Sequence, residues 1–327
     1  MKQRKKLLES IAETISDYRA EEIATPTPEH VEEWINQFDK SVQVSMLAEL
    51  DHVFKHTYMS KETVEEFLTN LVTSNKIAGD NPVAFWKDVC FLDIQGGGNS
   101  QREMLRMFNE VLEKECGLEI EDCGEEPEVY LYLDDAIFTG NRIKSDLDSW
   151  IQSEAPRKAN MHVVTIAIHL GGQWYAKNKI LESAKAAGKD IKITWWRCIE
   201  IEDRKAYIGS SDVLRPTVLP DDPPTQEYAH SLKYPPILRK PGNVGANNFF
   251  SSEDGRHLLE QEFLKAGVRI RSMCRHLNVY QRPLGNMVLE TLGFGSMIIT
   301  FRNCPNNCPL VFWAGDPWYP LFPRKTN

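Results

Sequence analysis

The chain has 327 residues, of which 42% are hydrophobic and 26% are charged, and its formal net charge at pH 7 is −9. This composition is typical of a globular protein with about two domains, and it excludes a disulfide-stapled miniprotein, a low-complexity chain and a fixed-period repeat. No apolar run approaches the length of a signal peptide or a membrane span, so we expect a cytoplasmic protein whose seven cysteines are free thiols.

Residues 1–80 predict a helical amino-terminal region. Thr27 precedes Pro28, which is the arrangement of a helix N-cap followed by proline at the first helical position. After Ser60, apolar residues recur on one helical face between residues 64 and 72. The carboxylates of this region fall on the polar faces of the helices, where solvation accounts for them. No chemistry is therefore predicted here.

Residues 81–209 predict strands that alternate with helices. An apolar run at 83–94 leads into a glycine-rich turn and then into a helix, which Ser100 and Glu103 would open as a capping box. Further strands are predicted at 129–133, 162–170 and 191–201, with helices after the first two of them. This order predicts an α/β fold with a mostly parallel sheet covered by helices on both faces. Ligands of such sheets bind at the carboxyl ends of the strands.

The last third of the chain is rich in proline and then basic. Seven of the 18 prolines lie in 210–246, which predicts an extended linker or wrapping arm. Residues 247–327 predict a small α+β cap with a helix at 255–277. From Ser231 onward the chain contains 12 Lys and Arg but only 6 Asp and Glu. This basic excess makes nucleic acid a candidate partner, although an uneven solvated surface is the commoner explanation.

Two carboxylates follow the strand predicted at 129–133. Asp134 and Asp135 precede Thr139-Gly140-Asn141, which we call the phosphate turn, at the start of a helix. The backbone N–H groups and the Thr139 hydroxyl could hold a phosphate there, and Gly140 permits close approach. The carboxylates could accept hydrogen bonds from ribose hydroxyls and stabilise positive charge on the sugar when the anomeric bond breaks. The alternative is a surface loop in which Asp135 caps a turn.

The segment VYLYLDDAIFTGN resembles the signature of type I phosphoribosyltransferases, which is an apolar strand, two acidic residues and then Thr-Gly. The resemblance implies a type I phosphoribosyltransferase-like core. It also implies that the catalytic pair Asp134 and Asp135 binds the ribose hydroxyls, while Thr139, Gly140 and Asn141 bind the 5′-phosphate. A magnesium ion is then expected to bridge ligand phosphates rather than to sit in a protein cage.

The turn one strand earlier, residues 95–100, is called the glycine turn here. The resemblance implies a pyrophosphate-binding loop at this position, although such turns commonly only tighten a strand-to-helix connection. Its candidate binding residues are Gln95, Gly96, Gly97, Gly98, Asn99 and Ser100.

The sequence departs from the family signature at three points. Arg142 replaces the usual Ser or Thr after the phosphate turn, and its guanidinium could clamp phosphate or pyrophosphate. Phe138 stands where purine-salvage members carry an aspartate base, which disfavours a 6-oxopurine substrate. The segment 101–133 is short and leaves little room for the family's basic lid loop.

The carboxy-terminal segment FRNCPNNCPLVFWAGDPWYPLFPR, together with the acidic pair, resembles a divergent phosphoribosyltransferase-like family of bacterial conflict and anti-phage systems, including retron-type operons. The resemblances cover residues 80–327. They imply a defence effector that acts at the anomeric carbon of a ribose 5-phosphate compound or nucleotide, by transfer or by glycosidic cleavage. The alternatives are a non-catalytic sensor of a phosphoribosyl ligand that docks protein partners, and a structural subunit with an inactive pocket.

Cysteines near the carboxyl terminus form a candidate metal site. Cys304 and Cys308, with Cys274 and His276 upstream, could supply four zinc ligands. The spacing around Pro305 is better explained by a packed turn, so we predict no protein-held metal.

Two further groups have both a functional and a simpler explanation. His169, at the end of a predicted strand, could act as an acid or base, but a buried or capping histidine is the commoner case. Trp313, Trp318 and Tyr319 could stack on a nucleobase, but packing in a core is favoured.

Overall fold

A computed structural model describes residues 2–20, 22–97 and 99–325. The chain forms two compact units. One is Glu62–Glu200, the sheet unit, and the other joins Met1–Lys61 with Ile201–Asn327 and is called the split unit. The regions predicted from sequence cut across this division, because 1–80 and 247–327 both contribute residues to the split unit.

The sheet unit is built on four strands in the order β2-β3-β4-β5. These strands are β2 (Val89–Phe91), β3 (Val129–Ile137), β4 (Lys158–His169) and β5 (Asp190–Ile201). β3 pairs in parallel with β2 on one side and with β4 on the other. The predicted α/β class is confirmed at this level.

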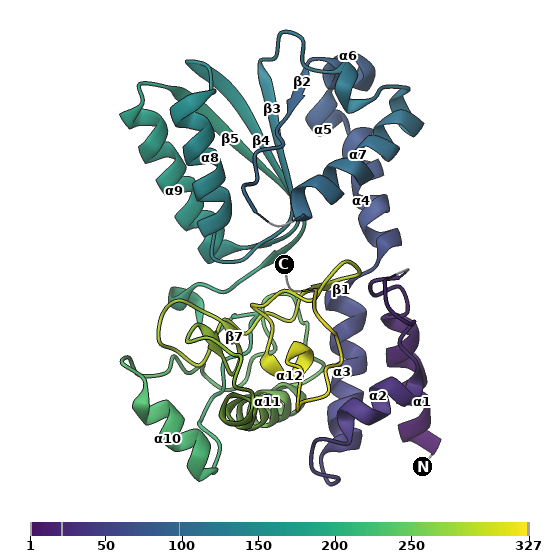
Figure 1. The fold of residues 1–327 in the computed structure, drawn as a ribbon, viewed down its shortest axis with the longest axis vertical. Coiled ribbons are helices and arrows are strands. Elements are labelled where there is room, and N and C mark those ends of the chain that lie inside the picture. Colours follow the sequence, from purple (N-terminus) through teal and green to yellow (C-terminus); the bar gives the residue numbers. More distant parts are fainter. Residues whose placement is uncertain (1, 21, 98, 326–327) are drawn as a thin grey trace. The chain divides into compact units, whose positions relative to one another are not determined.

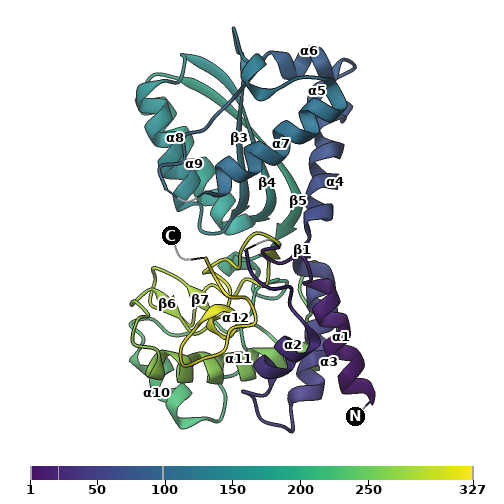
Figure 2. The same cartoon turned by 45° about the vertical axis from the view of Figure 1, so that its right-hand side comes forward.

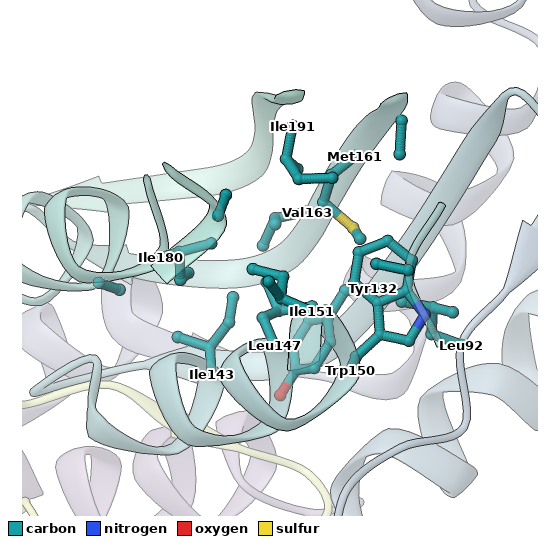
Figure 3. Close-up of a cluster of buried hydrophobic side chains, with 14 of the residues drawn as sticks. Leu92, Tyr132, Ile143, Leu147, Trp150, Ile151, Met161, Val163, Ile180 and Ile191 are labelled. Carbon is teal, nitrogen blue, oxygen red and sulfur yellow. The ribbon is translucent and has the colours of Figure 1, made fainter. Parts of the chain in front are cut away.

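Helices cover both faces of this sheet (Figures 1 and 2). On one face lies α7 (Ser100–Cys116), whose Phe108 ring is 5.3 Å from the ring of Phe91. On the other face α8 (Asn141–Ser153) and α9 (Leu170–Ala186) share a buried cluster with Tyr132, as Figure 3 shows. The helix that follows β2 and the helix that follows β3 thus cover opposite faces of the sheet. In open α/β sheets, ligands bind between two such strands.

Three shorter helices precede the sheet, namely α4 (Lys61–Val72), α5 (Asn75–Ala78) and α6 (Pro82–Lys87). The strand predicted at 83–94 is wrong in its first half, because α6 occupies it. The Asn81 side chain caps this helix by accepting from the Ala84 N–H at 3.1 Å, and Pro82 follows it. An apolar run alone does not distinguish a buried strand from a buried helix.

Three predicted boundaries near the candidate site also differ from the structure. The capping box is wrong, because Asn99 is the N-cap of α7 and the Ser100 hydroxyl donates to Gln95. The strand predicted to end at residue 133 continues to Ile137, so the acidic pair belongs to β3 itself. The strand predicted at 162–170 ends one residue earlier, because α9 already begins at residue 170.

The split unit holds the remaining elements. They are α1 (Lys2–Thr14), α2 (Pro28–Ile35), α3 (Gln43–Thr57), β1 (Tyr58–Met59), α10 (Pro223–Ser231), α11 (Glu253–Met273), β6 (Gln281–Arg282), β7 (Gly285–Asn286), β8 (Ile299–Thr300) and α12 (Leu310–Trp313). Single 3-10 turns lie at Ile120–Asp122 in the sheet unit and Lys205–Tyr207 here. As predicted, Thr27 caps α2 by accepting from the His30 N–H. β1 pairs in parallel with β8, so the two ends of the chain meet in one unit.

Part of the basic charge in the last third of the chain is internal. Arg239 and Arg256 are buried and both pair with Glu260, at 2.8 and 2.9 Å, and Arg239 also pairs with Glu253. These two guanidiniums therefore do not contribute to a solvent-facing basic surface. Within the described residues, no helix is long and apolar enough to span a membrane.

Candidate functional site

The acidic pair lies at the carboxyl end of β3. Asp134 is buried, with 4% of its surface exposed, and its Oδ1 accepts from the backbone N–H of Asp135 at 2.9 Å. Asp135 is half-buried, and its own Oδ1 accepts from the N–H of Ala136 at 2.7 Å. Asp134 is therefore fixed in orientation, while Asp135 is the more accessible carboxylate.

The phosphate turn follows β3 and opens α8. Gly140 is the N-cap, with φ = 77°, and makes no side-chain cap hydrogen bond. The N–H of Asn141 lies 3.5 Å from the Thr139 hydroxyl oxygen. In its described first turn, α8 carries no acidic residue that would neutralise the positive end of the helix dipole. The start of α8 can therefore take an anion.

The backbone of the phosphate turn packs directly on the start of α9. A Cβ atom on Gly140 would lie 2.2 Å from the carbonyl oxygen of Gly172, and one on Gly172 would lie 1.9 Å from that of Phe138. Only glycine permits this approach at either position. Gly172 is a residue that the sequence analysis did not select, although a Gly-Gly pair directly after a predicted strand was a usable signal.

The glycine turn lies next to the acidic pair. Gln95 is buried, and its Nε2 donates to Asp134 Oδ2 at 3.2 Å. Its Oε1 accepts from the Ser100 hydroxyl at 3.1 Å, so one amide joins the start of α7 to the acidic pair. Gln101 supports this arrangement, because its Oε1 accepts from the Gln95 N–H at 2.8 Å.

The described part of the glycine turn also contacts α8. Gly96, Gly97 and Asn99 are exposed, and the carbonyl oxygen of Gly97 accepts a hydrogen bond from Arg142. Gly98 lies outside the described residues. The structure therefore brings the predicted turn, the acidic pair and the phosphate turn together at one edge of the sheet.

A comparison with known protein families bears on this arrangement. The family model PRTase-CE matches residues 31–324. The chain belongs to the PRTase-CE family. The match confirms the predicted relation to phosphoribosyltransferase-like proteins, and its range includes the whole sheet unit. The chain has no significant match among curated proteins or solved structures.

In this PRTase-CE protein, His169 supports the end of β3. Its Nδ1 donates to the carbonyl oxygen of Ile137 at 3.0 Å, and its ring lies 4.8 Å from that of Phe138. Complete burial lowers the pKa of His169 to about 3. The side chain is therefore neutral near pH 7 and is the buried histidine that the sequence favoured over an acid or base.

Asp146 of α8 is a buried charge that the sequence analysis missed. Its Oδ2 accepts from the Tyr132 hydroxyl at 2.9 Å. Burial raises the pKa of Asp146, while the Tyr132 hydroxyl, the charge of Arg142 and the Gly96 backbone N–H each lower it. The available signal was its place among Ile143, Leu147 and Trp150, since an aspartate on an apolar helix face requires partners.

The remaining candidates of this PRTase-CE protein lie in the split unit. The thiols of Cys304 and Cys308 are buried and donate to the carbonyls of Pro305 and Ile298, at 3.7 and 3.2 Å. Cys274 donates to the Gly315 carbonyl at 3.4 Å. Across residues 2–20, 22–97 and 99–325, no three His, Cys, Asp or Glu side chains are placed to hold a metal ion.

The aromatic candidates Trp313 and Trp318 are both buried. Their indole N–H groups donate to the carbonyls of Cys308 and Val311, each at 2.9 Å. Tyr319 is half-buried, and its hydroxyl contacts His30 at 2.7 Å. These contacts are those of core side chains, as the favoured explanation expected.

Proposed function

We propose that the sheet unit binds a ribose 5-phosphate compound at the carboxyl end of β3 and acts at its anomeric carbon. The reaction is transfer of the phosphoribosyl group or glycosidic cleavage of a nucleotide, on a type I phosphoribosyltransferase-like core. The observation that supports this most is the start of α8, which is open to an anion and directly follows two carboxylates. Membership of the PRTase-CE family agrees with a phosphoribosyl ligand.

Each part of the site has a role in this proposal. The backbone N–H groups of the phosphate turn, with the Thr139 hydroxyl, bind the 5′-phosphate. Asp134 and Asp135 accept from the ribose hydroxyls and stabilise the positive charge that grows on the ring as the anomeric bond breaks. Arg142 and the glycine turn hold the departing anion.

Magnesium fits this site as a ligand-bridged ion. Asp135 is half-buried at the carboxyl end of β3, and carboxylate oxygens are ligands that this hard cation prefers. The described chain places no three acidic, His or Cys side chains together, so the ligand's phosphates would supply other oxygens. The ion would neutralise phosphate charge.

The proposed biological role is that of an effector in bacterial anti-phage defence, of the retron-operon type. It is supported by the resemblance of the carboxy-terminal segment to conflict-system proteins. Protein partners from the same operon, and nucleic acid at the basic last third, are the proposed partners.

A second candidate function is a non-catalytic sensor of the same ligand. The short segment 101–133 favours it, because it leaves little room for a lid loop that would exclude water from the site. The sensor would bind a phosphoribosyl compound and pass the signal to its partners.

The decisive experiment combines binding with turnover. The protein, alone and with its operon neighbours, is incubated with phosphoribosyl pyrophosphate, nucleotides and magnesium, beside the double variant Asp134→Asn, Asp135→Asn. Loss of the charges should lower turnover by about 100-fold or more. The control Asp93→Asn, which changes an exposed aspartate of the same unit, should retain wild-type rates.

The outcomes separate the candidates. Binding without turnover would support the sensor and contradict the enzyme, and absence of binding would contradict both. Full activity of the double variant would show that the site lies elsewhere. Phage plating on cells that carry the operon, with wild-type or double-variant protein, tests the defence role.

A further inference from the structure

Arg142 of α8 contacts the glycine turn, and Asp146 follows one helical turn later. The guanidinium of Arg142 donates to the carbonyl oxygen of Gly97. Asp146 lies four residues further along α8, so the two side chains share one face of the helix. Burial raises the pKa of the Asp146 carboxyl, while the charge of Arg142 and the Gly96 backbone N–H lower it.

A side chain of β3 holds Asp146 in place. The residue is 9% exposed, and the hydroxyl of Tyr132 in β3 donates to its Oδ2 at 2.9 Å. Figure 3 shows Tyr132 beside Leu147 and Trp150, so an apolar cluster surrounds this anchor. The Tyr132 hydroxyl, the Arg142 charge and the Gly96 N–H favour the charged form of Asp146, and burial opposes it by raising the pKa.

The other side of the glycine turn is held through the side chain of Gln95. Gln95 donates to Asp134 at 3.2 Å and accepts from Ser100 at 3.1 Å. Gly96 and Gly97 thus lie between Gln95, whose side chain contacts Asp134, and the guanidinium of Arg142 from α8. An anion at this turn would meet Arg142, which binds a charged phosphate oxygen more strongly than a neutral carbonyl.

We propose that Asp146 is a positioning residue for the pyrophosphate half of the ligand. It orients Arg142 and the Gly96 peptide, and thereby sets the affinity of the glycine turn for pyrophosphate without touching the ribose 5-phosphate half. The inference rests on the proposed function, because it assigns the turn to the leaving group of that reaction.

The test is calorimetric titration of the full chain with three probes in magnesium buffer: ribose 5-phosphate, inorganic pyrophosphate and phosphoribosyl pyrophosphate. In Asp146→Asn the amide has one acceptor oxygen for two donors and no charge for Arg142. We expect about tenfold weaker binding of both pyrophosphate compounds, which is the loss of one charge-assisted hydrogen bond. Binding of ribose 5-phosphate should stay within about twofold.

The matched control is Asp148→Asn, the same substitution two residues later in α8. Asp148 bonds to Ser183 and Lys144 and does not contact the glycine turn in the described chain. It should leave all three affinities unchanged. A second variant, Tyr132→Phe, removes the hydroxyl that donates to Asp146 and that also interacts with Gln95. It should weaken the two pyrophosphate compounds in the same selective way, and it decides the matter if Asp146→Asn fails to fold.

Two results in the Asp146→Asn variant, and two in the wild-type protein, would overturn the proposal. Either equal weakening of all three ligands or unchanged affinities in Asp146→Asn would show a structural role only. If the wild-type protein binds ribose 5-phosphate but not pyrophosphate, the inference fails and the proposed function survives. If the wild-type protein binds none of the three ligands, both fail.

Discussion

His169 is neutral because it is completely buried, and this has a consequence for stability. Its pKa falls from 6.5 to about 3 in the folded chain. Below pH 6.5 the unfolded chain takes up a proton that the folded chain does not bind until about pH 3. The unfolded state therefore binds more protons as the pH falls, and this residue destabilises the fold progressively from pH 6.5 down to the folded pKa.

The variant His169→Gln tests this. Because of this histidine, the unfolding free energy of the wild-type protein should be lower by about 2 kcal/mol at pH 5 than at pH 7.5. Urea unfolding at both pH values should show a smaller acid-induced loss in the variant than in the wild-type protein, whatever the variant's stability at pH 7.5. Equal losses in both proteins would mean that His169 is protonated in the fold.

Some residues of the site were predictable from sequence and others were not. Asp134, Thr139 and Gly140 lie together in a short motif, and the structure places them at one strand end. Gln95 and Asp146 act through partners that are distant in the sequence, namely Asp134 at 39 residues' separation and Tyr132 at 14. Local pattern does not reveal such pairs, because a strand must first bring them together.

At the scale of elements, the phosphate turn depends on how β3, α8 and α9 meet. Gly140 needs glycine for two reasons, which are its φ of 77° and the 2.2 Å that would separate a Cβ from the Gly172 carbonyl. Gly188, after α9, has a similar φ of 67° but open space around its Cα. A comparison of Gly140 with Gly188 therefore separates the cost of the left-handed backbone conformation from the cost of close packing.

Gly140→Ala and Gly188→Ala should therefore differ. Gly188→Ala carries only the left-handed backbone penalty of about 1 kcal/mol. Gly140→Ala adds a clash with backbone that cannot move alone, so we expect a further loss of at least about 1–3 kcal/mol and loss of ribose 5-phosphate binding. Thermal unfolding and titration measure both effects. Equal destabilisation by the two variants would contradict the packing of α9 on the phosphate turn.

The elements that sequence predicted well have an amphipathic pattern and a clear end signal. The helix predicted after the strand at 129–133 has an amphipathic pattern, since Ile143, Leu147 and Trp150 are all buried in α8. The end of β3 was misplaced, because charged residues usually terminate a strand. Here Asp134 stays in the sheet opposite Thr165, since hydrogen bonds from Gln95 and the Asp135 N–H satisfy its carboxylate.

At the scale of the whole molecule, the family match extends beyond the sheet. Residues 31–324 include most of the split unit, so that unit is part of what defines a PRTase-CE protein. Sequence periodicity predicted its helices but not that the first 61 residues share a core with residues 201–327. Such pairing depends on contacts between distant segments, on which local patterns carry no information.

Trp34 in α2 provides the test of that shared core. It is fully buried, its indole N–H donates to the Val311 carbonyl at 2.7 Å, and its ring lies 6.4 Å from Phe263 in α11 and 6.1 Å from Phe312 in α12. Trp34→Ala should cost about 3–5 kcal/mol. Because one core joins these helices, hydrogen exchange should accelerate in α11 and α12 as well as in α2.

The control for this experiment is Trp174→Ala, since Trp174 is 67% exposed and its loss should change stability by no more than about 0.5 kcal/mol. If Trp34→Ala accelerated exchange in α2 alone, the amino-terminal helices would be an appendage rather than part of the split unit. Acceleration that reaches α11 and α12 in that variant, with the control unchanged, would show that the first 61 residues and the last 127 fold as one cooperative body.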